Sequence, residues 1–199
     1  IDSMYDVMAM ETAMLKYVMD YIRENYANEI EILEAEVPVI NEIPCVTLLE
    51  AKEILGNKGS GNKLDLEPED EVSICEYAKE EFDSDFIFVT HFPSSKPPFY
   101  AMDSKEDPRL AYKFDLLFRG LEITSGGQRI HDYDEQVAKM KAQGLNPDDF
   151  KYYLEAHKYG LPPHGGLGIG LERLVMKIIN AQNIRTCSMF PRDINRLLP

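Results

Sequence analysis

Residues 113–131, KFDLLFRGLEITSGGQRIH, decide how this chain folds. Runs of aromatic and β-branched residues lie on both sides of Gly120, so the stretch predicts two strands joined across that glycine. The similar stretch FIFVTHF (86–92) predicts another strand. Two shorter segments, FYAMD (99–103) and NIRTCSMF (183–190), are further strand candidates.

Helical patterns fill most of the remaining sequence. Residues 5–27 space their apolar side chains as one amphipathic helix. A capping box from Thr47 to Glu50 begins a short helix, and Pro68 begins another. Later helices are predicted over 134–144, over 147–160 and after the glycine-rich stretch 165–170.

The order of these elements indicates the fold class. Helices come first, in a mainly helical part over 1–85, and strands cluster over 86–199. This order predicts an α+β fold in which a largely antiparallel sheet is flanked by helices.

Composition excludes several classes of protein. The chain has 21 Lys and Arg against 35 Asp and Glu, a net charge of −14, which argues against a general nucleic-acid coat but leaves room for local phosphate contacts. It has no apolar run of 18 residues, which predicts no membrane span. Three cysteines without a CxxC pair predict reduced thiols in a cytoplasmic protein, and the histidines show no zinc-ligand spacing with them. Because residue 1 is Ile, we expect a processed product or a piece of a longer protein.

The glycine-rich segment GGLGIGLER (165–173) is the first candidate site. Glycines at 166, 168 and 170 alternate with the period of a strand, which leaves one strand face bare for a flat ligand. Arg173 follows in the first turn of the next helix, where a guanidinium suits a phosphate. The alternative is a glycine strand that packs closely on another element, with Arg173 in a structural salt bridge.

Two carboxylates and a serine form the second candidate site. Asp115 and Glu122 lie on separate strand segments joined across Gly120, so they can converge on one Mg²⁺, and Ser125 can add an oxygen. The alternative is two surface carboxylates and a turn serine.

The third candidate site is SGGQRIH (125–131). If this segment is extended, Ser125, Arg129 and His131 share a face, and an arginine beside two glycines is a good receptor for a small carboxylate. The alternatives are an ion pair for Arg129 and a structural role for His131. His164, which borders the glycine strand, also remains a candidate.

Together these residues resemble the class II aminoacyl-tRNA synthetases, and within them the aspartyl-tRNA synthetases of the archaeal/eukaryotic-like type. GIGLER (168–173) is similar to the third motif of that class, and FDL (114–116) with GLEITSGGQRIH (120–131) is similar to the aspartate-specific signature. The resemblance implies that Gly170, Leu171, Glu172 and Arg173 bind ATP. It implies that Glu122 and Ser125 contact Mg²⁺, ATP and aspartate, with Asp115 as a further carboxylate near the metal. It also implies that Arg129, with Gln128 beside it, grips the aspartate side chain.

The same resemblance implies an activity. L-Aspartate would be activated by ATP to aspartyl-adenylate and transferred to tRNA, with Mg²⁺ as cofactor and Arg129 and Arg173 as the catalytic arginines. Catalysis would consist of positioning and charge neutralisation. The family also implies a homodimeric full-length parent in the cytoplasm.

Parts of the family pattern are missing or altered in this sequence. The anticodon-binding barrel and the first two class motifs are absent, so we expect the 199-residue chain to fold at least in part but to activate aspartate poorly. Relatives usually carry a basic residue where Pro97 stands, so either Lys96 substitutes from one position earlier or that substrate contact is lost.

Other functions remain open at this point. One is a synthetase-like paralogue with another adenylation or amidation role, or an asparaginyl-tRNA synthetase. Another is a non-catalytic binding module, which would bind neither ATP·Mg²⁺ nor aspartate in calorimetry.

Overall fold

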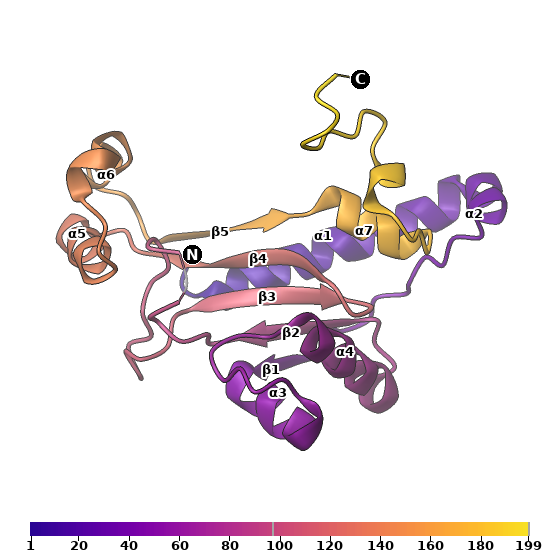
Figure 1. The fold of residues 1–199 in the computed structure, drawn as a ribbon, viewed down its shortest axis with the longest axis horizontal. Helices are drawn as coiled ribbons and strands as arrows, with labels where there is room; N and C mark the ends of the chain where they lie inside the picture. The colour runs from indigo at the N-terminus through magenta and orange to yellow at the C-terminus, as the bar shows by residue number, and fades with distance from the viewer. Residues whose placement is uncertain (97, 199) are drawn as a thin grey trace.

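One five-stranded sheet organises the fold, in a computed structural model that describes residues 1–96 and 98–198. The strands lie side by side in sequence order (Figure 1): β1 (Cys45–Thr47), β2 (Phe86–Thr90), β3 (Lys113–Phe118), β4 (Glu122–Arg129) and β5 (His164–Ile169). Only the β1–β2 pair is parallel, and the other pairs are antiparallel. The predicted α+β fold with a largely antiparallel sheet is therefore confirmed.

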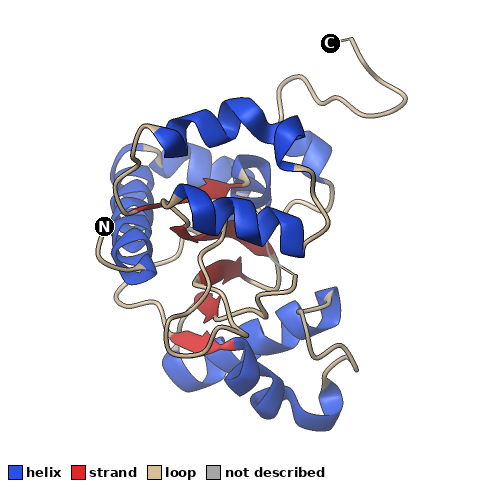
Figure 2. Ribbon diagram, turned by 90° about the vertical axis from the view of Figure 1, so that its left-hand side faces the viewer, coloured by secondary structure: helices blue, strands red, loops and turns tan. Residues whose placement is uncertain are grey.

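Helix α1 (Met4–Asn25) covers one face of this sheet. Its inward side chains, among them Leu15 and Met19, pack on Phe88 and Phe114 of the neighbouring strands. Since successive strand residues point to opposite faces, the other face carries Ile87, Val89 and Leu117. These residues pack against α3 (Leu48–Leu55) and α4 (Pro68–Phe82). Figure 2 shows the strands with helices on both sides.

The remaining helices lie around the sheet. Helix α2 (Ala27–Leu33) continues from α1, and α7 (Leu171–Ile178) follows β5 directly. Helices α5 (Tyr133–Ala142) and α6 (Lys151–Lys158) pack together between the end of β4 and the start of β5 (Figure 1). The described residues also form the 3-10 helices η1 (Gly56–Lys58), η2 (Pro147–Phe150) and η3 (Ile184–Cys187).

Several local predictions were wrong or incomplete. Residues 183–190 do not form a strand: the Asn183 side chain accepts from the Arg185 backbone N–H and caps the 3-10 helix η3. Residues 99–103 make only isolated bridges, Ala101 with Arg129 and Asp103 with Ala111. The sequence analysis also missed α2 and the three-residue strand β1.

The capping-box prediction is confirmed. Thr47 accepts from the Glu50 backbone N–H at 3.2 Å, and the Glu50 carboxylate accepts from the Thr47 backbone N–H at 2.7 Å. The cysteines are all free thiols. Across the described ranges, none of the helices combines the length and apolar character that crossing a membrane requires.

Candidate active site

A β-bulge places the second candidate group on one face of the sheet. Glu122 and Ser125 are three residues apart, so a regular strand would point them to opposite faces. Opposite them, however, Leu117 pairs with Glu122 and Asp115 pairs with Ser125, only two residues apart. The extra residue, Ile123, is therefore a bulge. It brings Glu122, Ser125 and Asp115 onto the same face.

Strand β5 has the bare glycine face that the alternation predicted, and this face adjoins the group of Asp115, Glu122 and Ser125. Gly168 pairs with Ser125 and Gly166 pairs with Gly127, so the bare side of β5 continues the face that carries Ser125. A Cβ atom added at Gly166 would lie 3.0 Å from Nη2 of Arg129. The glycine therefore makes the space that the Arg129 guanidinium occupies.

Arg129 is held in this space, and at least one N–H of its guanidinium has no hydrogen-bond partner there. Its guanidinium lies over the Tyr100 ring, 5.2 Å from the centroid, a cation–π arrangement. The Arg129 Nε atom is buried and donates to no acceptor in the described chain. A buried guanidinium N–H without a partner favours an anionic ligand there.

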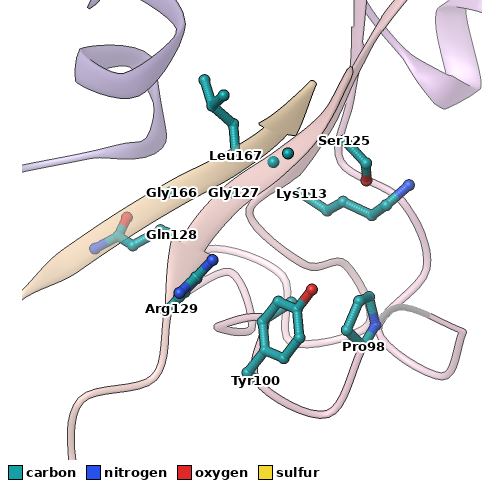
Figure 3. Close-up of a pocket in the computed structure, with 12 residues that line it drawn as sticks. Pro98, Tyr100, Lys113, Ser125, Gly127, Gln128, Arg129, Gly166 and Leu167 are labelled. Carbon is teal, nitrogen blue, oxygen red and sulfur yellow. The ribbon is translucent and has the colours of Figure 1, made fainter. Parts of the chain in front are cut away.

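Arg129 and Ser125 open into one pocket of about 300 Å³ (Figure 3). The floor is glycine backbone from β4 and β5, and Tyr100 and Pro98 form a side. Among the described residues that line it there is no Asp or Glu, while Arg129 and Lys113 are both cationic. In a chain of net charge −14, this pocket suits a small anion.

Acidic side chains gather at the Glu122 end of the same sheet face. Asp115 is buried, and its Oδ2 accepts from Lys113 Nζ at 2.5 Å, while its Oδ1 has no hydrogen-bond partner in the described chain. Burial raises the pKa of the Asp115 carboxyl, an effect that Lys113 opposes. Burial and then the neighbouring Asp115 raise the pKa of Glu122.

Helix α4 adds a third carboxylate that sequence reasoning missed. Glu71 accepts from the backbone N–H of Glu122 at 2.8 Å, and burial raises its pKa. Within the described ranges, no group of three or more His, Cys, Asp and Glu side chains is arranged to hold a metal ion by itself. A cation at this end would therefore need ligands from elsewhere, such as water or a phosphate.

Arg173 reaches this acidic group from the C-terminal part of the chain. It lies in the first turn of α7, whose N-cap is Gly170. Its Nη1 donates to the Glu122 carbonyl oxygen at 2.7 Å and lies 3.9 Å from Glu122 Oε1. The structural salt bridge that we considered as an alternative is thus present. The guanidinium nevertheless stays 45% exposed and open to a ligand.

Several predicted site residues point away from the Arg129 pocket or lie outside it. Gln128 contributes to the lining of the Arg129 pocket, but its side chain points to the opposite face of β4, where it lines a second hollow beside Met4 and Tyr5. Lys96 pairs with Asp65 at 2.6 Å, outside the Arg129 pocket.

His131 lines a different hollow, together with His157 and Tyr133. His164 begins β5 opposite Arg129, and its Nδ1 lies 3.0 Å from the Pro162 carbonyl oxygen. Leu171 and Glu172 are exposed on α7. The departure at Pro97 lies outside the described residues.

Lys113 and Tyr100 are pocket residues that the sequence analysis did not find. Lys113 was detectable in principle, because it precedes Asp115 by two residues and therefore shares its strand face. Tyr100 carried no such signal, because it lies in a segment with no regular periodicity.

Comparisons with known proteins identify the family to which this fold belongs. Residues 1–194 match the family of class II tRNA synthetases described as D, K and N. The chain belongs to this family.

Within the family, the relatives include aspartate–tRNA ligases. The Thermus thermophilus aspartate–tRNA(Asp/Asn) ligase is 46% identical over 98% of this chain and 46% of its own length. The aspartate–tRNA(Asp) ligase of Pyrococcus abyssi is 41% identical over 100% of this chain and 46% of its own length. The chain thus spans about half the length of these curated relatives.

Solved structures show the same fold. An aspartyl-tRNA synthetase from Entamoeba histolytica superimposes with a TM-score of 0.94 at 31% identity, over 100% of this chain and 42% of that one. An asparaginyl-tRNA synthetase from Pyrococcus horikoshii superimposes with a TM-score of 0.87 at 31% identity, over 98% of this chain and 47% of that one.

Proposed function

We propose that this protein activates L-aspartate with ATP to aspartyl-adenylate and transfers the aspartyl group to tRNA. The observation that carries the proposal is the arrangement along β4. Arg129 lies in an acid-free pocket at one end, and Glu122 and Arg173 lie together at the other, on one sheet face. The names of the aspartate–tRNA ligases among the relatives support the same reaction.

In the proposed reaction, the protein acts by holding aspartate and ATP in position and by neutralising their charge. Arg129 holds the side-chain carboxylate of aspartate, and the glycine face of β5 lets the nucleotide approach the backbone. Arg173 neutralises charge on the phosphates of ATP. The α-carboxylate of aspartate then attacks the α-phosphate, pyrophosphate leaves, and no covalent intermediate with the enzyme is required.

Mg²⁺ fits the donors at the acidic end. The unpartnered Oδ1 of Asp115, the carboxylate of Glu122 and the hydroxyl of Ser125 are hard oxygen ligands, and the remaining positions would be filled by water and phosphate oxygens. A bound Mg²⁺ would neutralise triphosphate charge. We further propose a homodimeric full-length enzyme in the cytoplasm, in line with the family resemblance.

Asparagine is the second candidate substrate, because an asparaginyl-tRNA synthetase shares this fold. The two choices differ in charge at the atom that Arg129 contacts. An unpartnered guanidinium N–H in a pocket without acidic lining favours a carboxylate over a neutral carboxamide.

The test is ATP–pyrophosphate exchange by the full-length protein. The Arg129→Ala variant should lose aspartate-dependent exchange by a factor on the order of 100, because a buried charge-assisted contact is removed. Calorimetry should show ATP·Mg²⁺ binding unchanged. Wild-type exchange with asparagine instead of aspartate, or full exchange by Arg129→Ala, would contradict the proposal.

A further inference from the structure

Lys113 is the second cation of the Arg129 pocket. It begins β3 and pairs in register with Gly127, which lies between Ser125 and Arg129 on β4. Its side chain is only 15% exposed. In Figure 3 its ammonium lies on the Ser125 side of the pocket, whereas Arg129 lies on the opposite side beside Tyr100.

The neighbours of the Lys113 ammonium hold it in place but do not accept from all of its N–H donors. Its Nζ donates to Asp115 Oδ2 at 2.5 Å and lies 3.8 Å from the centroid of the Phe92 ring. An ammonium carries three N–H donors. The aromatic face attracts the cation without accepting a conventional hydrogen bond. The described lining of the pocket contains no carboxylate, so the remaining donors are open to an anionic ligand.

Two cations with unused donors therefore face one pocket. Arg129 has an unpartnered Nε, and Lys113 has donors beyond its bond to Asp115. The nearby carboxylates of Asp115 and Glu122 do not line the pocket. A ligand that satisfies both cations carries two anionic groups, which is the chemistry of a short dicarboxylate.

We propose that Lys113 is a substrate-binding residue that holds the α-carboxylate of aspartate while Arg129 holds the side-chain carboxylate. The proposal rests on the proposed function and names the residue that recognises the reacting end of its substrate. Lys113 lies between Arg129 and the acidic end, which is where an amino acid and a nucleotide would meet. Holding the carboxylate there orients it towards the α-phosphate and offsets the repulsion between the two anions.

Lys96, which the sequence offered as a substitute for the basic residue of the relatives, lies outside this pocket. Lys96 pairs with Asp65, and its side chain is 46% exposed outside this pocket. Lys113 supplies a cation inside the pocket from another strand.

The experiment compares two probes on the full-length protein by calorimetry. L-Aspartate carries both carboxylates, and β-alanine lacks the α-carboxylate but keeps the amine and the other carboxylate. The wild type should bind aspartate at least ~10-fold more tightly than β-alanine. Lys113→Met should weaken aspartate binding by roughly 10- to 100-fold, as expected for one charge-assisted hydrogen bond, and change β-alanine binding by less than about twofold.

Matched variants separate recognition from structure. Lys113→Arg should restore aspartate binding to within a few fold, because it keeps the charge. Arg129→Met should weaken binding of both probes. Lys79→Met, at an ion-paired lysine of α4, should change neither. Thermal melting monitors folding, and Lys113→Gln replaces the Met variant if that variant does not fold.

The outcomes distinguish this inference from the proposed function. If Lys113→Met and Lys113→Gln bind aspartate as the wild type does while Arg129→Met does not, the role of Lys113 is refuted and the proposed function stands. A wild type that binds the two probes equally well refutes it too. A wild type that binds neither aspartate nor ATP·Mg²⁺ refutes both.

Discussion

Glu11 places a carboxyl group inside the core beneath the sheet that carries the candidate active site. It lies in α1 with no exposed surface, and both of its carboxylate oxygens lack a hydrogen-bond partner in the described chain. The polar group that faces it is the Thr124 hydroxyl of β4, which opposes the rise in the Glu11 pKa but does not meet hydrogen-bond geometry with any partner in the described chain. Burial raises the pKa of Glu11 to about 7. Ionisation of Glu11 therefore lowers the free energy of unfolding, by an amount that depends on pH.

The sign and size of this cost follow from linkage. The ordinary pKa of glutamate is 4.5, and in the folded protein it is about 7, so between these values the folded state binds more protons than the unfolded state. Stability therefore falls as the pH rises through this window. At about 1.4 kcal/mol per pH unit, the loss above pH 7 is about 3 kcal/mol.

The perturbation is Glu11→Gln, which keeps the shape and removes the titration. At pH 8 the variant should be more stable than the wild type by about 3 kcal/mol, and near pH 4.5 the two should be equal. For a chain of this size, the difference at pH 8 corresponds to a rise of roughly 6–12 °C in melting temperature.

Urea unfolding, followed by circular dichroism from pH 4.5 to 8.5, measures the difference directly. Other titrating groups cancel when variant and wild type are compared at the same pH. Glu24→Gln, at an exposed position of the same helix, is the control and should show no such dependence. A difference between Glu11→Gln and wild type that is the same at every pH would refute the reasoning.

Two further predictions concern glycines. Gly166→Ala should weaken aspartate binding about tenfold, because the new Cβ would lie 3.0 Å from Arg129 Nη2; calorimetry measures this, and unchanged affinity would contradict it. Gly127→Ala should destabilise the fold by about 2 kcal/mol or more, because its Cβ would lie 2.5 Å from the Tyr112 carbonyl oxygen, which is backbone and cannot move aside. Urea unfolding measures the second effect, with Gly61→Ala as the control, since nothing lies within 4 Å of that position.

Periodicity predicted the parts of the site that depend on regular strands. The alternation of Gly166 and Gly168 indicated a bare strand face, and that face does adjoin Ser125. The segment around Arg129 was predicted to be extended, which gave Ser125 and Arg129 their common face. Each inference needed only the strand period of two.

The rest of the site depends on geometry that residue types do not encode. Glu122 and Ser125 share a face only because Ile123 is a bulge, and nothing in the triplet distinguishes a bulge from a regular strand. His131 was placed with Arg129 by extending the strand, but β4 ends at Arg129 and His131 turns towards another hollow. Strand β1 is three residues long, too short for a pattern to show.

The sheet arranges charge in a way that fits the anionic substrates of the proposed function. Strand β4 carries Glu122 at one end and Arg129 at the other, and the bulge keeps both on one face. Lys113 lies between them and donates a hydrogen bond to Asp115. The side chains on this face therefore change from acidic to basic from the Glu122 end of β4 to the Arg129 end. In the proposed function, the acidic end would take a triphosphate with its cation, and the basic end would take a dicarboxylate. Removing the bulge would turn Glu122 away from the pocket face without changing any residue of the pocket. The arrangement of acidic and basic side chains on one face therefore depends on the extra residue Ile123 as well as on the charged residues themselves.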